Sequence, residues 1–166
     1  MNLLLITGSM GAGKTTTLGE ASDLLAQHAV PHAAIDLDGL GLWHSPHPAD
    51  ALWVDNLRCV SANYATAGID RLLIAAAVET ADDLEAVIEA TGAASVAVCR
   101  LRAPLEVMES RVLARECGVQ SAYYVSRVRI LDRILDESGL EHFSVDTTQS
   151  VTGAARELLQ RAGWIA

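Results

Sequence analysis

The stretch Gly8-Ser9-Met10-Gly11-Ala12-Gly13-Lys14-Thr15 fits the pattern GxxxxGK[ST] at every position. The apolar run 2–7 precedes it as a predicted buried strand, and residues 14–28 follow it with the apolar spacing of a helix. A glycine-rich turn between a strand and a helix presents consecutive backbone N–H groups and the helix N-terminus to an anion. Pattern and context together predict a phosphate-binding loop, the P-loop (residues 8–15).

Each residue type in this loop suits phosphate binding. Glycines let the backbone approach an anion in conformations that side chains exclude. We expect Lys14 to lie between the β- and γ-phosphates, Thr15 to coordinate Mg2+ and Thr16 to reach the α-phosphate. Lys14 is the only lysine among twelve basic residues, which favours a role that a planar arginine cannot fill. The predicted ATP-binding residues are Gly8, Ser9, Met10, Gly11, Ala12, Gly13, Lys14, Thr15 and Thr16.

The composition limits the class of protein. With 166 residues, 51% of them hydrophobic and 20% charged, the chain is expected to form a single domain over residues 1–166. A net charge of -9 argues against nucleic acid or an anionic membrane surface as a partner. No apolar stretch of about 18 residues predicts a membrane span. Three cysteines without a CxxC pair predict neither a disulfide framework nor a zinc site, and we expect a cytoplasmic protein.

Predicted strands and helices alternate along the whole chain. Five short, nearly continuous apolar strands separated by helices predict a five-stranded parallel sheet with helices on both faces, the three-layer α/β sandwich of P-loop NTPases. The expected strands are 2–7, 33–36, 71–78, 95–101 and 141–145, and the expected helices are 14–28, 50–67, 80–91, 104–116, 121–137 and 150–161. Residues of about 39–50 are predicted to form a mobile substrate loop, and those of about 116–122 a short lid.

Missing motifs narrow the choice among nucleotide-binding proteins. A GTPase would need Asn-Lys-x-Asp to recognise guanine, and the position of the single lysine excludes that motif. The predicted strand 71–78 ends without the aspartate of many P-loop ATPases, and Glu79 is the nearest carboxylate. These features favour a small kinase over a motor ATPase.

The chain resembles the small-molecule kinases of the P-loop superfamily: shikimate, gluconate and adenylylsulfate kinases and, above all, the chloramphenicol phosphotransferase-like enzymes. The resemblance rests on the P-loop, on Ala34-Ile35-Asp36-Leu37-Asp38, on residues 101–115 and on Val145-Asp146-Thr147-Thr148. It implies an ATP- and Mg2+-dependent phosphotransferase. It also implies that residues 34–38 face the substrate, that 101–115 lead to the lid and that 145–148 border the adenine.

The predicted catalytic groups lie at the carboxyl ends of the strands, where open parallel sheets bind ligands. We assign Asp36 the role of catalytic base or Mg2+ ligand and Asp38 a hydrogen bond to the substrate, and these two roles could be exchanged. Phosphoryl transfer also needs cationic groups on the transferring phosphate besides Lys14, and Arg115 is the predicted clamp.

The acceptor is expected to be a small molecule that carries a hydroxyl group. The predicted substrate-binding residues are Asp38, Trp43, Asn56, Arg58 and Glu79, which lie in or near the substrate loop, on helix 50–67 or just past the third strand. Antibiotic, nucleoside, sugar and sulfonucleotide acceptors remain open, as does the oligomeric state. The alternative function is an ATP-binding regulatory or accessory protein with weak ATPase activity, which acts through a protein partner.

Overall fold

A single parallel sheet forms the centre of the molecule. The computed structural model describes residues 1–40, 52–115 and 121–166. The strand order is β2-β3-β1-β4-β5, and every neighbouring pair is parallel, as predicted. The strands are β1 (Asn2–Thr7), β2 (Ala33–Asp36), β3 (Arg71–Ala75), β4 (Ser95–Arg102) and β5 (Phe143–Asp146).

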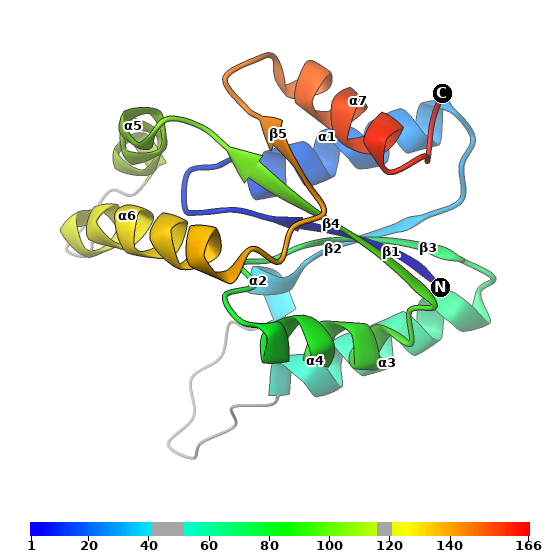
Figure 1. Ribbon diagram of the computed structural model, residues 1–166. Coiled ribbons are helices and arrows are strands. Elements are labelled where there is room, and N and C mark those ends of the chain that lie inside the picture. The colour runs from blue at the N-terminus through cyan, green and yellow to red at the C-terminus, as the bar shows by residue number, and fades with distance from the viewer. Residues whose placement is uncertain (41–51, 116–120) are drawn as a thin grey trace.

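Helices cover both faces of the sheet, which gives the predicted three layers (Figure 1). On one face α1 (Lys14–Gln27) packs beside α7 (Val151–Arg161), and on the other α3 (Leu52–Thr66) packs beside α4 (Ala81–Thr91). The single turn of α2 (Leu37–Leu40) follows β2. The remaining pair, α5 (Leu105–Arg115) and α6 (Ser121–Ser138), pack together at the side of the sheet where the strands end (Figure 1).

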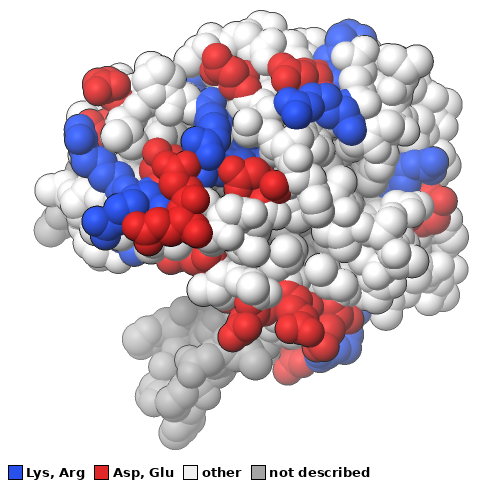
Figure 2. All heavy atoms as spheres, in the orientation of Figure 1, with Lys and Arg blue, Asp and Glu red and all other residues white. Residues whose placement is uncertain are grey.

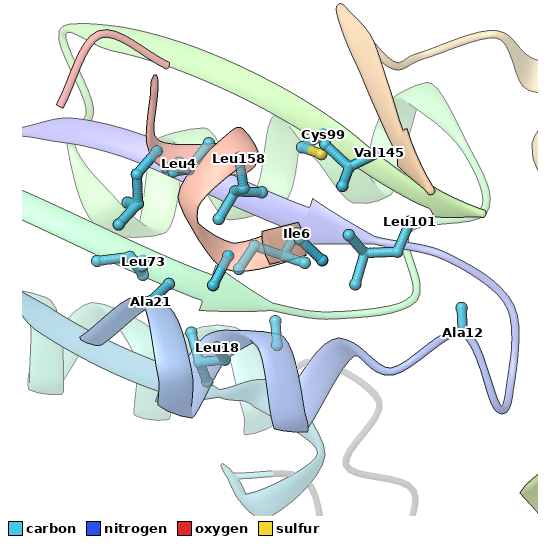
Figure 3. Close-up of a cluster of buried hydrophobic side chains, with 14 of the residues drawn as sticks. Leu4, Ile6, Ala12, Leu18, Ala21, Leu73, Cys99, Leu101, Val145 and Leu158 are labelled. Atoms are coloured by element: carbon cyan, nitrogen blue, oxygen red, sulfur yellow. The ribbon is translucent and has the colours of Figure 1, made fainter. Parts of the chain in front are cut away.

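Strand β1 explains why the sheet needs helices on both faces. Its apolar side chains alternate between two fully covered cores. Leu4 and Ile6 face α1 and α7, where they pack in one cluster with Leu18 and Leu158 (Figure 3). Leu3 and Leu5 face α3 and α4 in a second cluster. A strand that is buried on both faces reads as a continuous apolar run, which is how β1 was predicted.

Local signals place several helix ends as the sequence predicts. Thr80 caps α4: its hydroxyl accepts from the backbone N–H of Asp83, whose carboxylate accepts from the backbone N–H of Thr80. Ser150 caps α7 by accepting from the backbone N–H of Gly153. The apolar face expected for α1 is also the buried one and comprises Leu18, Ala21, Leu24 and Leu25.

The end of strand β3 and the segment after β2 differ most from the sequence prediction. Strand β3 ends at Ala75 rather than Val78, because its neighbour β1 turns into the P-loop after Thr7 and offers no further strand to pair with. Ala76 and Val78 remain buried, so the apolar run continues past the end of the ladder. Leu37–Leu40 form α2, where an irregular loop was predicted from residue 38 onward.

The two segments predicted to move fall largely outside the described residues. This holds for 41–50 of the substrate loop and 116–120 of the lid, whereas 39–40 belong to α2 and 121–122 to α6. Within the described ranges, none of the helices has the length and apolar character needed to cross a membrane. Figure 2 shows basic and acidic side chains intermixed over α5 and α6, with acidic side chains gathered over α4.

Candidate active site

The P-loop has the tight geometry that its glycines predict. Gly11 and Gly13 have φ angles of +76° and +96°, which L side chains rarely adopt. A Cβ atom on Gly11 would overlap the carbonyl group of Met108 in α5, and one on Gly8 would lie 2.8 Å from the carbonyl oxygen of Leu101. Glycine is therefore required both by the curvature of the loop and by its close packing against the chain around α5.

The outer side of the P-loop is bonded to the helix pair α5 and α6. The buried hydroxyl of Ser9 donates to the carbonyl oxygen of Val128 in α6 at 2.7 Å. Arg111 of α5 donates to the carbonyl oxygen of Gly11 at 3.2 Å and to that of Thr147, after β5, at 2.7 Å. These bonds fix the loop from behind and leave its N–H groups as the binding surface.

Lys14 lies folded against the loop that it belongs to. Its ammonium donates to the carbonyl oxygens of Gly8, at 2.9 Å, and Ser9, at 3.3 Å. Burial lowers the pKa of Lys14 below its usual value, and this effect outweighs the opposing charges of Asp38 and Asp36. A buried cation held only by neutral carbonyls is well placed to exchange these bonds for phosphate oxygens.

Thr15 and Asp36, the two residues assigned to Mg2+ from the sequence, are in direct contact. The hydroxyl of Thr15 donates to Asp36 Oδ2 at 2.6 Å, and the backbone N–H of Asp38 donates to Asp36 Oδ1 at 3.2 Å. A hydroxyl and a carboxylate beside a phosphate loop are the hard oxygen donors that Mg2+ prefers. No cluster of three or more His, Cys, Asp or Glu side chains suited to a metal occurs in the described part of the chain. Any Mg2+ here would thus need phosphate oxygens or water as further ligands.

A cavity of about 820 Å³ opens beside the P-loop, and we call it the carboxyl-edge cavity. Three predicted site residues line it: Asp38 from α2, Glu79 after β3 and Arg115 at the end of α5. The remaining lining residues are mostly apolar or aromatic: Met10, Leu37, Trp53, Ala76, Ala77, Val78, Thr80, Asp83, Val87 and Tyr124. The cavity therefore combines a few charged groups with an apolar wall, which is typical of small-molecule sites.

An ion pair connects two walls of this cavity. Arg127 of α6 donates to Glu79 at 2.9 Å, and both side chains are about one-third exposed. Two further arginines, Arg129 and Arg133, lie on the same helix as Arg127. Arg129 is paired with Glu109 at 2.6 Å, and Arg133 lies 3.8 Å from Glu137. In this structure these three arginines are thus engaged with carboxylates.

A second, smaller pocket of about 150 Å³ lies at the start of α1. It is lined by residues of α1, α5, α7 and the segment after β5: Gly13, Thr16, Thr17, Arg111, Thr147, Gln149, Val151 and Ala154. We call it the β5-side pocket. The two cavities share no lining residue and lie on either side of the P-loop sequence, since Met10 lines the larger one and Gly13 the smaller.

Two predicted substrate residues do not line the carboxyl-edge cavity, and a third lies outside the described residues. The amide of Asn56 donates to the carbonyl oxygen of Leu40 at 3.2 Å, and the exposed Arg58 is paired with Asp55. Neither Asn56 nor Arg58 lines the carboxyl-edge cavity. Trp43 lies outside the described residues.

Sequence reasoning missed the residues that hold the walls in place. Arg111 of α5 contacts the P-loop through the carbonyl oxygen of Gly11. Arg100 of β4 is fully buried and forms ion pairs with Asp132, at 2.6 Å, and Asp136, at 2.8 Å, both on α6. The sequence did hold a signal for Arg100: a charged residue inside an apolar strand needs oppositely charged partners when it is buried.

The comparisons with known proteins identify the fold. No protein-family model matches the chain, and no curated protein matches it in sequence. Among solved structures, the tunicamycin resistance protein of Deinococcus radiodurans is similar with a TM-score of 0.68 at 18% identity, over 99% of this chain and 96% of that one. A sugar kinase from Janibacter sp. HTCC2649 gives 0.66 at 19% identity, over 96% and 93%. The shikimate kinase of Acinetobacter baumannii gives 0.64 at 20% identity, over 97% and 92%.

These neighbours confirm the predicted fold. The chain has the P-loop NTPase architecture found in small-molecule kinases, over nearly its whole length. At these identities the likeness defines the fold, and function has to be argued from the site itself.

Proposed function

We propose that this protein is an ATP- and Mg2+-dependent kinase that transfers the γ-phosphoryl group to a hydroxyl of a small molecule. One observation carries the proposal: the P-loop, the Thr15–Asp36 pair and the carboxyl-edge cavity lie together at one edge of the sheet. A phosphate loop alone would suit any ATPase, whereas a cavity of this size beside it supplies room for an acceptor. The sugar kinase and shikimate kinase neighbours agree with this class of reaction.

The two sides of the P-loop receive different parts of the reactants in this proposal. The triphosphate binds the loop N–H groups and Lys14, and the adenine enters the β5-side pocket beside Thr147. The acceptor occupies the carboxyl-edge cavity, where Asp38, Glu79 and Arg115 reach it. The hydrogen bonds from Ser9 and Arg111 keep the loop in the shape that binding requires.

The contacts of the two aspartates favour different roles for Asp36 and Asp38. Both carboxylate oxygens of Asp36 are engaged, one by Thr15 and one by the N–H of Asp38, and Asp36 does not line the carboxyl-edge cavity. We therefore place Asp36, with Thr15, on the Mg2+ side. When bound, Mg2+ would neutralise charge on the phosphate oxygens. Asp38 lines the cavity and is the base for the acceptor hydroxyl.

Transfer follows from these positions. The acceptor oxygen forms a bond to the γ-phosphorus, the bond from that phosphorus to the β,γ-bridging oxygen breaks, and ADP leaves with the electron pair. The hydroxyl proton passes to the carboxylate of Asp38. Lys14 and Arg115 stabilise negative charge on the transferring group, because cations fixed in place lower the barrier without reorganising.

The test measures ADP release with Mg2+ against a panel of hydroxylated small molecules. The panel contains aminoglycoside and phenicol antibiotics, nucleosides, adenylylsulfate, gluconate and shikimate. We expect at least one acceptor to stimulate turnover and Lys14→Ala to reduce that rate about 10²–10³-fold. Circular dichroism of the variant controls for folding.

Slow ATP hydrolysis that no acceptor accelerates would instead favour the alternative, a nucleotide-binding protein that acts through a partner. Phosphoryl transfer that survives in Lys14→Ala would contradict the role given to the P-loop.

A further inference from the structure

The charged groups around the carboxyl-edge cavity are not those that an anionic acceptor needs. Within the described residues, its lining contains three carboxylates, Asp38, Glu79 and Asp83, and one guanidinium, Arg115. A carboxylate or phosphate on the acceptor would have to be desolvated among these groups, and like charges placed together in an interface oppose binding strongly. The lining therefore selects by charge as well as by shape.

The three carboxylates come from different elements, and contacts to neighbouring residues fix Asp83 and Glu79. Asp83 is held by Thr80, whose backbone N–H and hydroxyl both donate to its Oδ2, at 3.0 and 2.8 Å. Glu79 is paired with Arg127, so this pair adds little net charge. Asp38, Asp83 and Arg115 are then the remaining charged groups of the described lining, and their net charge is negative.

Arg115 does not reverse this balance during the reaction. In the proposed function its guanidinium serves the transferring phosphoryl group, which already carries negative charge. No other described arginine, and not Lys14, lines the cavity. A bidentate partner for an acceptor carboxylate is thus missing from the described wall.

The uncharged part of the cavity wall is largely aromatic and aliphatic. Trp53 and Tyr124 provide aromatic surface, and Met10, Leu37 and Val87 provide aliphatic surface. Such surface gains free energy by covering an apolar face of a ligand and gains less from a fully hydroxylated one, which has less apolar area to cover.

From these observations, and resting on the proposed function, we infer that the acceptor is an uncharged or cationic hydroxylated molecule with an apolar face of ring size. Sugar acids, other hydroxylated carboxylic acids and phosphorylated acceptors are excluded by the same wall. A cationic group on the acceptor would lie toward Asp83, and the apolar face would contact Trp53.

The first experiment measures the charge of the cavity without any acceptor. In a Trp43→Phe/Trp164→Phe background, Trp53 is the only tryptophan, and its emission is quenched by caesium, iodide or neutral acrylamide at constant ionic strength. Relative to acrylamide, we expect caesium to quench Trp53 about twofold or more better than iodide, because a negative wall concentrates cations. A preference for iodide would overturn the inference.

Matched variants distinguish the effect of the carboxylates in the cavity wall from the effect of the protein's net charge. Glu79→Gln should reduce the preference for caesium. Asp70→Asn should leave it unchanged, because Asp70 is likewise paired with an arginine, Arg71 at 3.2 Å, but precedes the amino end of β3. An equal effect of both variants would show that only the overall charge is being measured, which contradicts the inference.

The second experiment tests acceptors that differ only in charge. The probes are 1-phenylpropane-1,3-diols with an ammonium, an acetamide or a succinamate group at C2. We expect kcat/KM for the ammonium and acetamide forms to exceed that of the succinamate by about tenfold or more. Faster turnover of the succinamate, still dependent on Lys14, would overturn the charge assignment and leave the phosphotransferase standing. Caesium preference at Trp53 without acceptor-stimulated turnover anywhere would support the charge assignment and contradict the phosphotransferase.

Discussion

The two sides of the P-loop are constructed in different ways. The phosphate side consists of backbone N–H groups from eight consecutive residues, braced from behind by Ser9 and Arg111. The proposed acceptor side consists of side chains that come from the P-loop, α2, α3, α4, α5, α6 and the turn after β3. A partly exposed ion pair, Glu79–Arg127, joins the turn after β3 to α6. One side is a local structure, and the other exists only once the whole chain has folded.

This difference predicts which kind of change each side tolerates. A backbone site depends on conformation, so it fails when φ angles or close contacts are disturbed. A side-chain cavity depends on the identity of single groups, so a substitution alters what it binds and leaves the fold intact. Three further predictions test this contrast, beginning with the largest expected effect.

Asp38→Asn should lower kcat for phosphoryl transfer about 10²-fold, because an amide cannot accept the acceptor proton. Its KM for ATP should change little, since Asp38 lines the cavity rather than the P-loop. The matched variant Asp36→Asn should instead raise the Mg2+ concentration needed for half-maximal rate. Steady-state kinetics over a Mg2+ series would measure both. If Asp38→Asn shifted the Mg2+ dependence and Asp36→Asn did not, the two roles would be exchanged.

Gly11→Ala should damage the phosphate side by about 1–3 kcal/mol of unfolding free energy, because alanine is strained at a φ of +76° and its Cβ meets the carbonyl of Met108. ATP affinity should fall with it. Gly19→Ala is the control: it lies within α1 with nothing near its added Cβ, and should stabilise by about 0.5–1 kcal/mol. Urea unfolding measures both, and equal effects would refute the contrast.

Asp136→Asn should have the smallest effect and a defined pH dependence. Burial alone would raise the pKa of Asp136, but Arg102 and Arg100 outweigh it and hold that pKa below the ordinary 3.8. The pair therefore contributes stability above about pH 3.8, and this contribution is lost as the pH falls through the lower native value.

For a half-exposed carboxylate the expected difference at pH 7 is about 0.2–1 kcal/mol. Thermal unfolding of the native protein and Asp136→Asn at pH 7, 5 and 3 would measure it. A gap between the two proteins that widened at pH 3 would contradict the assignment. Acceptor selectivity should be unchanged, because Asp136 does not line the cavity.

The sequence predicts well what is determined locally. The P-loop, the capping box at Thr80 and the alternation of β1 all depend on neighbouring residues, and each is found where expected. The predicted end of β3 was wrong because the strand ends where its partner β1, a distant part of the sequence, turns into the P-loop.

 No residue within β3 itself signals where the strand ends.

The acceptor side could be predicted only in part. Asp38, Glu79 and Arg115 were found because each follows a strand or ends a helix at the carboxyl edge, a position that topology alone defines. Asn56 and Arg58 were predicted because they lie on the helix that follows the substrate loop, but a place on a helix does not tell which face of α3 turns toward the site. Arg111 and Tyr124 had no local signal, because their contacts come from segments far away in the chain.

The position of Lys14 has a practical consequence for chemical labelling. Apart from the N-terminus, its ammonium is the only primary amine in the chain. Because burial lowers its pKa, a larger share of it is in the nucleophilic, uncharged form than for an ordinary lysine. An amine-directed reagent therefore labels this protein at one internal position, and the extent of labelling reports directly on whether the P-loop is occupied.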